Sequence, residues 1–199
     1  MPHVAPAHRN GRAMATLVAA VAVLGALQAL PPAWHAALRY DRAALLQGEL
    51  WRLWTGHLIH LGWAHWALNA AGLVLCGLLV DRPPGAAVLA RRAACLGLGI
   101  SLLFLLLVPT LSHYVGLSGV LYGLFVLGLW PGARRVDPVA IAALSTIAAW
   151  LCGQWLLGPD RREMELIGGP IIVQAHVFGV ACAALVLAAR RAGRSLAGT

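Results

Sequence analysis

Apolar runs long enough to cross a lipid bilayer recur along the whole chain. A membrane-spanning helix needs about 20 mostly apolar residues. Of the 199 residues, 60% are hydrophobic and only 11% are charged, whereas a soluble domain carries about 25% charged residues. The sequence therefore predicts an all-α, polytopic membrane protein. Glycine and proline separate six predicted transmembrane helices, which cover residues 13–30, 61–80, 93–110, 116–130, 138–157 and 171–190.

The arginines predict how these helices are oriented. Ten lie on one side of the predicted membrane: Arg9, Arg12, Arg82, Arg91, Arg92, Arg134, Arg135, Arg190, Arg191 and Arg194. Five lie on the other: Arg39, Arg42, Arg52, Arg161 and Arg162. Basic residues collect in cytoplasmic loops, so both termini are predicted to be cytoplasmic. The net charge of +8 then reflects topology, because no basic polar face suits nucleic acid.

Three regions follow from this topology. Residues 1–12 form a cytoplasmic N-terminal segment, residues 13–190 a six-span membrane domain, and residues 191–199 a cytoplasmic tail. The first apolar run precedes Pro31-Pro32 without a clear small-residue cleavage site. We interpret it as a retained span, with a cleaved signal peptide as the alternative.

The long connection over residues 31–60 is rich in tryptophan and carries the paired charges Glu49 and Arg52. It is too polar to span the bilayer and too apolar for a solvated loop. Tryptophan and tyrosine favour the membrane interface, so we expect a first outer loop partly embedded in the outer leaflet. The four cysteines all lie within apolar runs and are interpreted as packing residues: Cys76, Cys95, Cys152 and Cys182.

Polar groups within spans are costly, so each is a functional candidate. His65 and Asn69 are four residues apart and share one helix face. Their imidazole N–H and amide NH₂ groups could together stabilise an oxyanion. The alternative is ordinary hydrogen bonding between membrane helices.

A serine and a histidine are predicted to meet near the outer surface. Ser118 follows Gly116 at the start of the fourth span, where free backbone N–H groups favour an anionic oxygen. His176 lies about one turn into the sixth span, at a similar depth. Each has a pair of small residues beside it that are four positions apart and so share one helix face. These are Gly119 and Gly123 near Ser118, and Ala175 and Gly179 near His176. Close packing of these faces would give an activated nucleophile. The alternative is a packing role alone for Ser118.

Other chemistries fit less well. His57, His60, His65 and His176 could be considered as zinc ligands. The HExxH spacing of metalloproteases is missing, and no carboxylate lies within the spans. We therefore predict no metal and no cofactor, and a Ser–His dyad without a third acidic residue. A transporter or channel would spread polar residues across the membrane depth, whereas these cluster near one face.

Together these features resemble the rhomboid intramembrane serine proteases. The matching elements follow in order: Trp51-Arg52, His65-xxx-Asn69, Gly116-Leu117-Ser118-Gly119 with Tyr122, and Ala175-His176-xx-Gly179. The resemblance implies that Ser118 is the nucleophile and His176 its base. It implies an oxyanion hole made by His65, Asn69 and the backbone N–H of Ser118. Tyr122 would pack against the histidine, and Trp51 and Arg52 would order the outer loop, while Gly116, Gly119 and Gly179 would support the site.

Within this family, residues 48–61 and 114–123 are most similar to the rhombosortases. That similarity implies a bacterial inner-membrane enzyme. Its substrates would be transmembrane proteins with a C-terminal Gly-Gly motif, a hydrophobic helix and a basic tail. The alternatives are a general rhomboid protease with other transmembrane substrates, or a non-catalytic rhomboid-like protein that binds membrane clients.

Overall fold

The computed structural model describes residues 7–81 and 83–196. Arg82 and the outer parts of the predicted N-terminal segment and tail (residues 1–6 and 197–199) lie outside the described residues. The elements are α1 (Ala7–Gln28), α2 (Pro32–Leu38), β1 (Tyr40–Asp41), α3 (Arg42–Leu46), α4 (Arg52–Thr55), α5 (Trp63–Leu79), α6 (Ala86–Leu107), β2 (His113–Tyr114), α7 (Ser118–Ala133), α8 (Pro138–Leu157), α9 (Arg161–Ile167) and α10 (Val173–Leu196).

The described chain is helical apart from one short strand pair, so the predicted all-α class is confirmed. Four helices are long and apolar enough to cross a membrane: α1 from Gly11, α6, α8, and α10 as far as Gly193. The apolar helices α5 and α7 are shorter, with 17 and 16 residues. Each predicted span coincides with one of these six helices. That α5 and α7 also cross the bilayer stays a prediction.

Several helices extend beyond the predicted apolar runs. Helix α6 begins at Ala86, although the apolar run was expected to begin at residue 93. Helix α10 continues to Leu196, past the predicted end at residue 190. The added turns carry arginines such as Arg91 and Arg191. Arginine is a good helix former but too polar for lipid. Hydropathy therefore underestimates the length of a helix that continues through arginines beyond its apolar run.

Local sequence signals fix the ends of α8 and α9. Asp137 caps α8 by accepting a hydrogen bond from the backbone N–H of Val139, and Pro138 occupies the first helical position. Asp160 caps α9 in the same way through Arg162. Gly168 ends α9 in the left-handed conformation with φ of 85°. The chain between α8 and α10 is therefore a short capped helix held across the end of the bundle.

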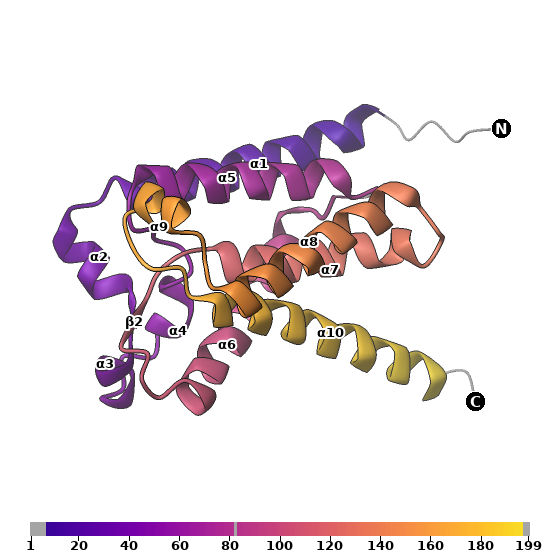
Figure 1. Cartoon of the computed structure of the whole chain (residues 1–199). Coiled ribbons are helices and arrows are strands. Elements are labelled where there is room, and N and C mark those ends of the chain that lie inside the picture. The colour runs from indigo at the N-terminus through magenta and orange to yellow at the C-terminus, as the bar shows by residue number, and fades with distance from the viewer. Residues whose placement is uncertain (1–6, 82, 197–199) are drawn as a thin grey trace.

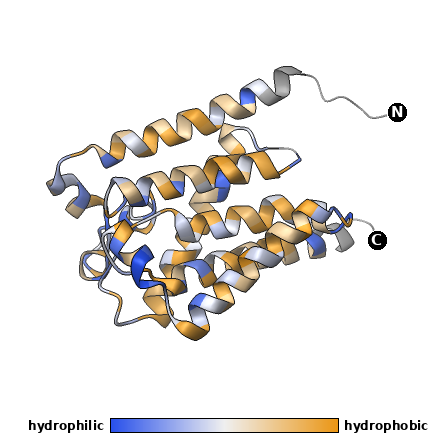
Figure 2. Cartoon of the chain, turned by 45° about the horizontal axis from the view of Figure 1, so that its top comes forward, coloured by the Kyte–Doolittle hydropathy of each residue, from blue (hydrophilic) through white to orange (hydrophobic). Residues whose placement is uncertain are grey.

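The long helices lie side by side, and the short elements gather at one end of them (Figure 1). Helices α2, α3 and α4, together with β2 and α9, occupy that end, whereas α1 begins and α10 ends at the opposite end. The long helices are largely hydrophobic along their length, and α9 is the most hydrophilic stretch (Figure 2). On α8, Trp150, Trp155, Leu156 and Leu157 are exposed. Such a surface suits contact with lipid rather than water.

The connection over residues 31–60 is ordered by hydrogen bonds from α4 to the end of α2. The Arg52 guanidinium is 7% exposed and pairs with Glu49. It also donates to the carbonyl oxygens of Ala36 and Arg39 at 2.8 and 2.9 Å. These carbonyls belong to the last turn of a helix, where no intrahelical donor is available. Arg52 therefore acts as a C-cap for α2.

Two neighbours of Arg52 complete this attachment. Trp51 donates its indole N–H to the carbonyl of Ala37, and the Thr55 hydroxyl donates to the carbonyl of Leu38. Just after α2, β1 pairs antiparallel with β2, with Tyr40 opposite Tyr114. This pairing joins the outer loop to the segment that leads into α7.

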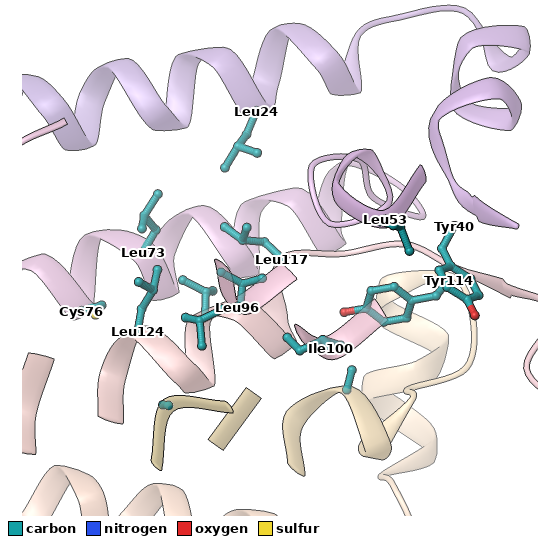
Figure 3. Packing of buried hydrophobic residues seen from close by; sticks show 14 of the residues in the cluster. Leu24, Tyr40, Leu53, Leu73, Cys76, Leu96, Ile100, Tyr114, Leu117 and Leu124 are labelled. Carbon is teal, nitrogen blue, oxygen red and sulfur yellow. The ribbon is translucent and has the colours of Figure 1, made fainter. Parts of the chain in front are cut away.

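The apolar core surrounds α7. Leu73 of α5, Leu96 of α6 and Leu124 of α7 are buried together in one cluster, as Figure 3 shows. At the loop end, Tyr40 packs edge-on against Phe104, which also contacts Tyr114. The core thus runs from the helical bundle into the ordered loop and holds the start of α7 in place.

Candidate active site

Helices α7 and α10 approach each other through small residues. A Cβ atom added at Gly119 would lie 2.7 Å from the carbonyl oxygen of Ala175, and one added at Gly179 would overlap the carbonyl oxygen of Gly119. Gly123 faces the carbonyl oxygen of Gly179 in the same way. The two small-residue faces expected from the sequence therefore meet, and backbone touches backbone along them.

This contact brings Ser118 and His176 together. Ser118 is the first residue of α7 and is half-buried, whereas His176 is 6% exposed. The distance from Ser118 Oγ to His176 Nε2 is 2.9 Å, which is a good hydrogen bond. A hydroxyl that donates to a neutral imidazole can pass its proton to the ring and become a nucleophile.

The other ring nitrogen of His176 faces a residue that sequence reasoning had not singled out. His176 Nδ1 lies 3.1 Å from the side-chain oxygen of Gln154 on α8. Gln154 is 6% exposed. The sequence analysis anticipated no carboxylate partner at this position, and a neutral amide occupies it instead.

The imidazole is also held on its face. The ring of Tyr122 stacks on that of His176, with centroids 4.4 Å apart and planes inclined by 12°. Tyr122 lies one turn after Ser118 on α7, so the nucleophile and the stacking ring come from the same helix. The structure thus places Tyr122 against one face of the histidine.

The backbone before Ser118 is fixed at Gly116. Gly116 has a φ of +125°, a backbone conformation that residues with a side chain rarely adopt. Its N–H donates to the carbonyl oxygen of Gly56, and its own carbonyl accepts from the Tyr114 hydroxyl at 2.8 Å. A Cβ here would lie 2.6 Å from Cε1 of His65. Both the positive φ and the close approach of the His65 ring therefore require glycine at this position.

His65 and Asn69 lie on one face of α5, in the same cavity as Ser118. The backbone N–H of Leu61 donates to Nδ1 of His65, so in a neutral ring the hydrogen is on Nε2, on the side of Gly116. Asn69 donates one amide hydrogen to the carbonyl oxygen of His65 at 2.9 Å. Its second amide hydrogen remains for another acceptor. Both side chains can therefore supply a donor to this cavity.

The cavity has a volume of about 970 Å³, and residues of the short elements α2, β2 and α9 line it together with residues of the long helices. The residues that line it include His65, Asn69, Ser118 and His176 from the long helices and Glu163 from α9. Burial raises the pKa of Glu163, and the negative charge of Asp160 raises it further. The pocket is large enough for an extended peptide segment, since ligand pockets commonly span 300–1,000 Å³.

His57 faces away from this cavity. Its Nε2 lies 3.0 Å from both the Gly97 carbonyl oxygen and the Ser101 hydroxyl on α6. His60 and His65 do touch, with ring centroids 5.1 Å apart. Across residues 7–81 and 83–196, no three His, Cys, Asp or Glu side chains gather in a way that could hold a metal ion. The four-histidine grouping considered from the sequence therefore does not form there.

Gln154 and Glu163 are the main residues of the cavity region that the sequence analysis missed. Gln154 lies inside the predicted span 138–157, so the rule that a polar residue in a membrane helix is a functional candidate would have found it. The sequence could not predict which way the Gln154 side chain points, because α8 is almost uniformly apolar around its axis. Glu163 belongs to a connecting segment without a recognisable signature.

Comparison with known families agrees with this geometry. Residues 47–192 match the Rhomboid domain family, which covers more than half of the chain. No curated protein matches the sequence. Rhomboid proteins are intramembrane serine proteases, with some inactive members, and act on transmembrane substrates in the bilayer. The chain is a multi-pass membrane protein and belongs to the rhomboid family.

Proposed function

We propose that the chain is an intramembrane serine endopeptidase in which Ser118 is the nucleophile and His176 its general base. The observation that carries this proposal is the 2.9 Å hydrogen bond between the two side chains, which both line a peptide-sized cavity. Non-catalytic members of the family usually lack the serine or the histidine, whereas this chain has both.

The proposed oxyanion hole consists of His65 Nε2–H, the free amide hydrogen of Asn69 and the backbone N–H of Ser118. The first N–H groups of a helix have no intrahelical acceptor, and they carry the positive end of the helix dipole. Ser118 begins α7, so its N–H is one of these free donors and can be offered to developing negative charge. Loss of one such donor in other hydrolases costs about 10²- to 10³-fold in turnover.

The reaction follows from these positions. The Ser118 Oγ proton moves to His176 Nε2 as Oγ bonds to the scissile carbonyl carbon, and the carbonyl oxygen becomes an oxyanion. Collapse of this intermediate breaks the C–N bond, and His176 returns the proton to the leaving amine. A water molecule then gives a proton to His176 as its oxygen bonds to the acyl carbon. Collapse of this second intermediate breaks the bond from the carbon to Ser118 Oγ, and His176 returns the proton to Oγ, which releases the new carboxyl end and restores the serine.

The proposed topology has six spans and places the active-site end of the bundle at the outer membrane face. Helices α1 and α10 begin and end, respectively, at the opposite end of the bundle. Together with the arginine distribution, this supports cytoplasmic termini. The similarity to rhombosortases supports a bacterial inner membrane as the location. Substrates would enter the site from the outer half of the bilayer.

The proposed substrates carry a C-terminal Gly-Gly motif followed by a hydrophobic helix and a basic tail, as in rhombosortase substrates. The similarity of residues 48–61 and 114–123 to that group supports this choice. Glycine also weakens a substrate helix by about 1 kcal/mol per residue, which favours the extended form that a protease must bind.

The test uses purified full-length enzyme in proteoliposomes with a tagged Gly-Gly-tail substrate. Ser118→Ala and His176→Ala should each abolish cleavage, whereas Cys152→Ala and added chelator should leave it unchanged. Cleavage that survives Ser118→Ala would refute the serine mechanism. Cleavage of transmembrane substrates without the Gly-Gly motif at an equal rate would favour a general rhomboid protease. Capture of substrate without cleavage would favour the client-binding alternative.

A further inference from the structure

We propose that Gln154 is a positioning residue that extends the Ser–His pair to a Ser–His–Gln arrangement. This inference rests on the proposed function of Ser118 and His176. Helix α8 would thereby contribute to catalysis, because Gln154 would favour the imidazole tautomer that can accept the serine proton.

The geometry of the histidine ring supports this role. A neutral imidazole has one N–H donor and one acceptor nitrogen. An amide oxygen 3.1 Å from Nδ1 favours the hydrogen on that nitrogen. Nε2, 2.9 Å from Ser118 Oγ, is then the acceptor. This is the tautomer that general-base catalysis requires.

The burial of Gln154 supports a specific role as well. Only Ala140 and Gln154 are buried among the residues of α8. Its amide nitrogen has no hydrogen-bond partner within the described residues. Burial of an incompletely paired amide is unfavourable in proteins. An apolar residue would pack here at lower cost, so the contact with His176 is the feature that explains a glutamine.

The contact also matters during the reaction. When Nε2 takes the proton of Ser118, the ring becomes an imidazolium with an N–H on both nitrogens. The hydrogen bond from Nδ1 to Gln154 then has a charged donor and becomes stronger. Gln154 would therefore stabilise the transition state more than the ground state, which is the condition for a contribution to turnover.

The experiment compares Gln154→Met and Gln154→Glu in the full-length protein in proteoliposomes. Methionine keeps the length of the side chain without the amide, whereas glutamate keeps an acceptor and adds charge. The readouts are kcat and KM on the tagged substrate, their pH profiles, and the rate at which a fluorophosphonate probe labels Ser118. Gln174→Met, the same change on half-buried Gln174 of α10, is the control.

We expect Gln154→Met to lower kcat and the labelling rate about 10- to 100-fold with little change in KM. Gln154→Glu should retain more activity than the methionine variant. Its carboxylate would favour the imidazolium, so the acid limb of its rate–pH profile should move to higher pH by roughly one unit. Gln174→Met should behave as wild type.

Two results would overturn the inference. One is an unchanged kcat and labelling rate per folded molecule in Gln154→Met. The other is a glutamate variant that is no faster than the methionine variant and has the wild-type pH profile, because a purely structural side chain would not move that profile. A failure of the proposed protease function looks different: the wild-type protein would then neither label with the probe at Ser118 nor cleave.

Discussion

The aromatic ring of Tyr122 lies almost parallel to the imidazole of His176, with the two centroids 4.4 Å apart. Ser118 Oγ and the Gln154 side-chain oxygen meet the two nitrogens at the edge of the imidazole. The ring is therefore held on one face and at two points of its edge. Helices α7 and α8 supply this support to a histidine carried by α10.

The stack predicts unequal effects of two substitutions at Tyr122. Aromatic pairs of this kind contribute about 0.5–1.5 kcal/mol, which corresponds to roughly 2- to 10-fold in rate. Tyr122→Leu should therefore lower kcat by up to about 10-fold, whereas Tyr122→Phe should stay close to wild type. Trp130→Leu, at the exposed far end of α7, is the control. A phenylalanine variant as slow as the leucine variant would show that the hydroxyl, not the stack, is what matters.

The contact between α7 and α10 predicts a severe effect of a single methyl group. Gly179→Ala would place a Cβ against the carbonyl oxygen of Gly119, so the helices must separate and Ser118 must move away from His176. We expect loss of cleavage by more than about 100-fold, since a shift of 1 Å at a reacting centre can cost that much. Thermal unfolding in detergent micelles should also begin at a lower temperature.

Gly193→Ala on the same helix is the matched control, because no atom lies within 4 Å of the Cβ position at Gly193. Alanine is the better helix former by about 1 kcal/mol, so this variant should be active and no less stable than wild type. Equal behaviour of the two alanine variants would contradict the tight contact.

The helices and the small-residue contact could be predicted from the sequence because both have local or periodic signals. Apolar runs indicated the long helices, and the spacing of Gly119, Gly123, Ala175 and Gly179 indicated which faces would meet. The start of α7 at Ser118 differs from the expected residue 116, because Gly116 adopts a positive φ that a helix cannot contain.

The remaining features depend on contacts between distant segments. The pairing of Tyr40 with Tyr114 joins two-residue strands, which are too short for an alternating pattern. The contact of Gln154 with His176 depends on the rotation of α8 about its axis. An almost uniformly apolar helix carries no periodic signal for that rotation, so the sequence could predict the serine and the histidine but not the amide between α8 and α10.

The attachment of α4 to α2 predicts that Arg52 cannot be replaced by lysine. The arginine satisfies Glu49 and two backbone carbonyls at once, and an ammonium group cannot reproduce this planar geometry. Arg52→Lys should lower the free energy of unfolding by about 1–3 kcal/mol. Arg161→Lys, on the exposed surface of α9, should have no measurable effect. Equal unfolding temperatures for the two variants would show that the capping of α2 is unimportant.

Asp41 should make the stability of the outer loop depend on pH. Burial alone would raise the pKa of this carboxyl, but the Ala44 N–H and the nearby His113, Arg39 and Arg52 outweigh burial and lower it. A lowered pKa in the folded state means that the ionised group stabilises the fold above its ordinary value of 3.8. This contribution is lost as the pH falls below that value and through the lower pKa of the folded state.

Asp41→Asn isolates this charge, because asparagine still caps α3. Partly exposed ion pairs contribute about 0.2–1 kcal/mol, so the variant should unfold a few degrees lower than wild type at pH 7. The two proteins should converge near pH 3 and below, as the wild-type carboxyl becomes protonated. Thermal unfolding in micelles across this pH range measures the difference.

Asp160→Asn, at the exposed cap of α9, is the control and should show a smaller difference from wild type at pH 7. If the difference in unfolding temperature between wild type and Asp41→Asn stays the same at the lowest pH, the asparagine disturbs packing and the charge of Asp41 contributes nothing to stability.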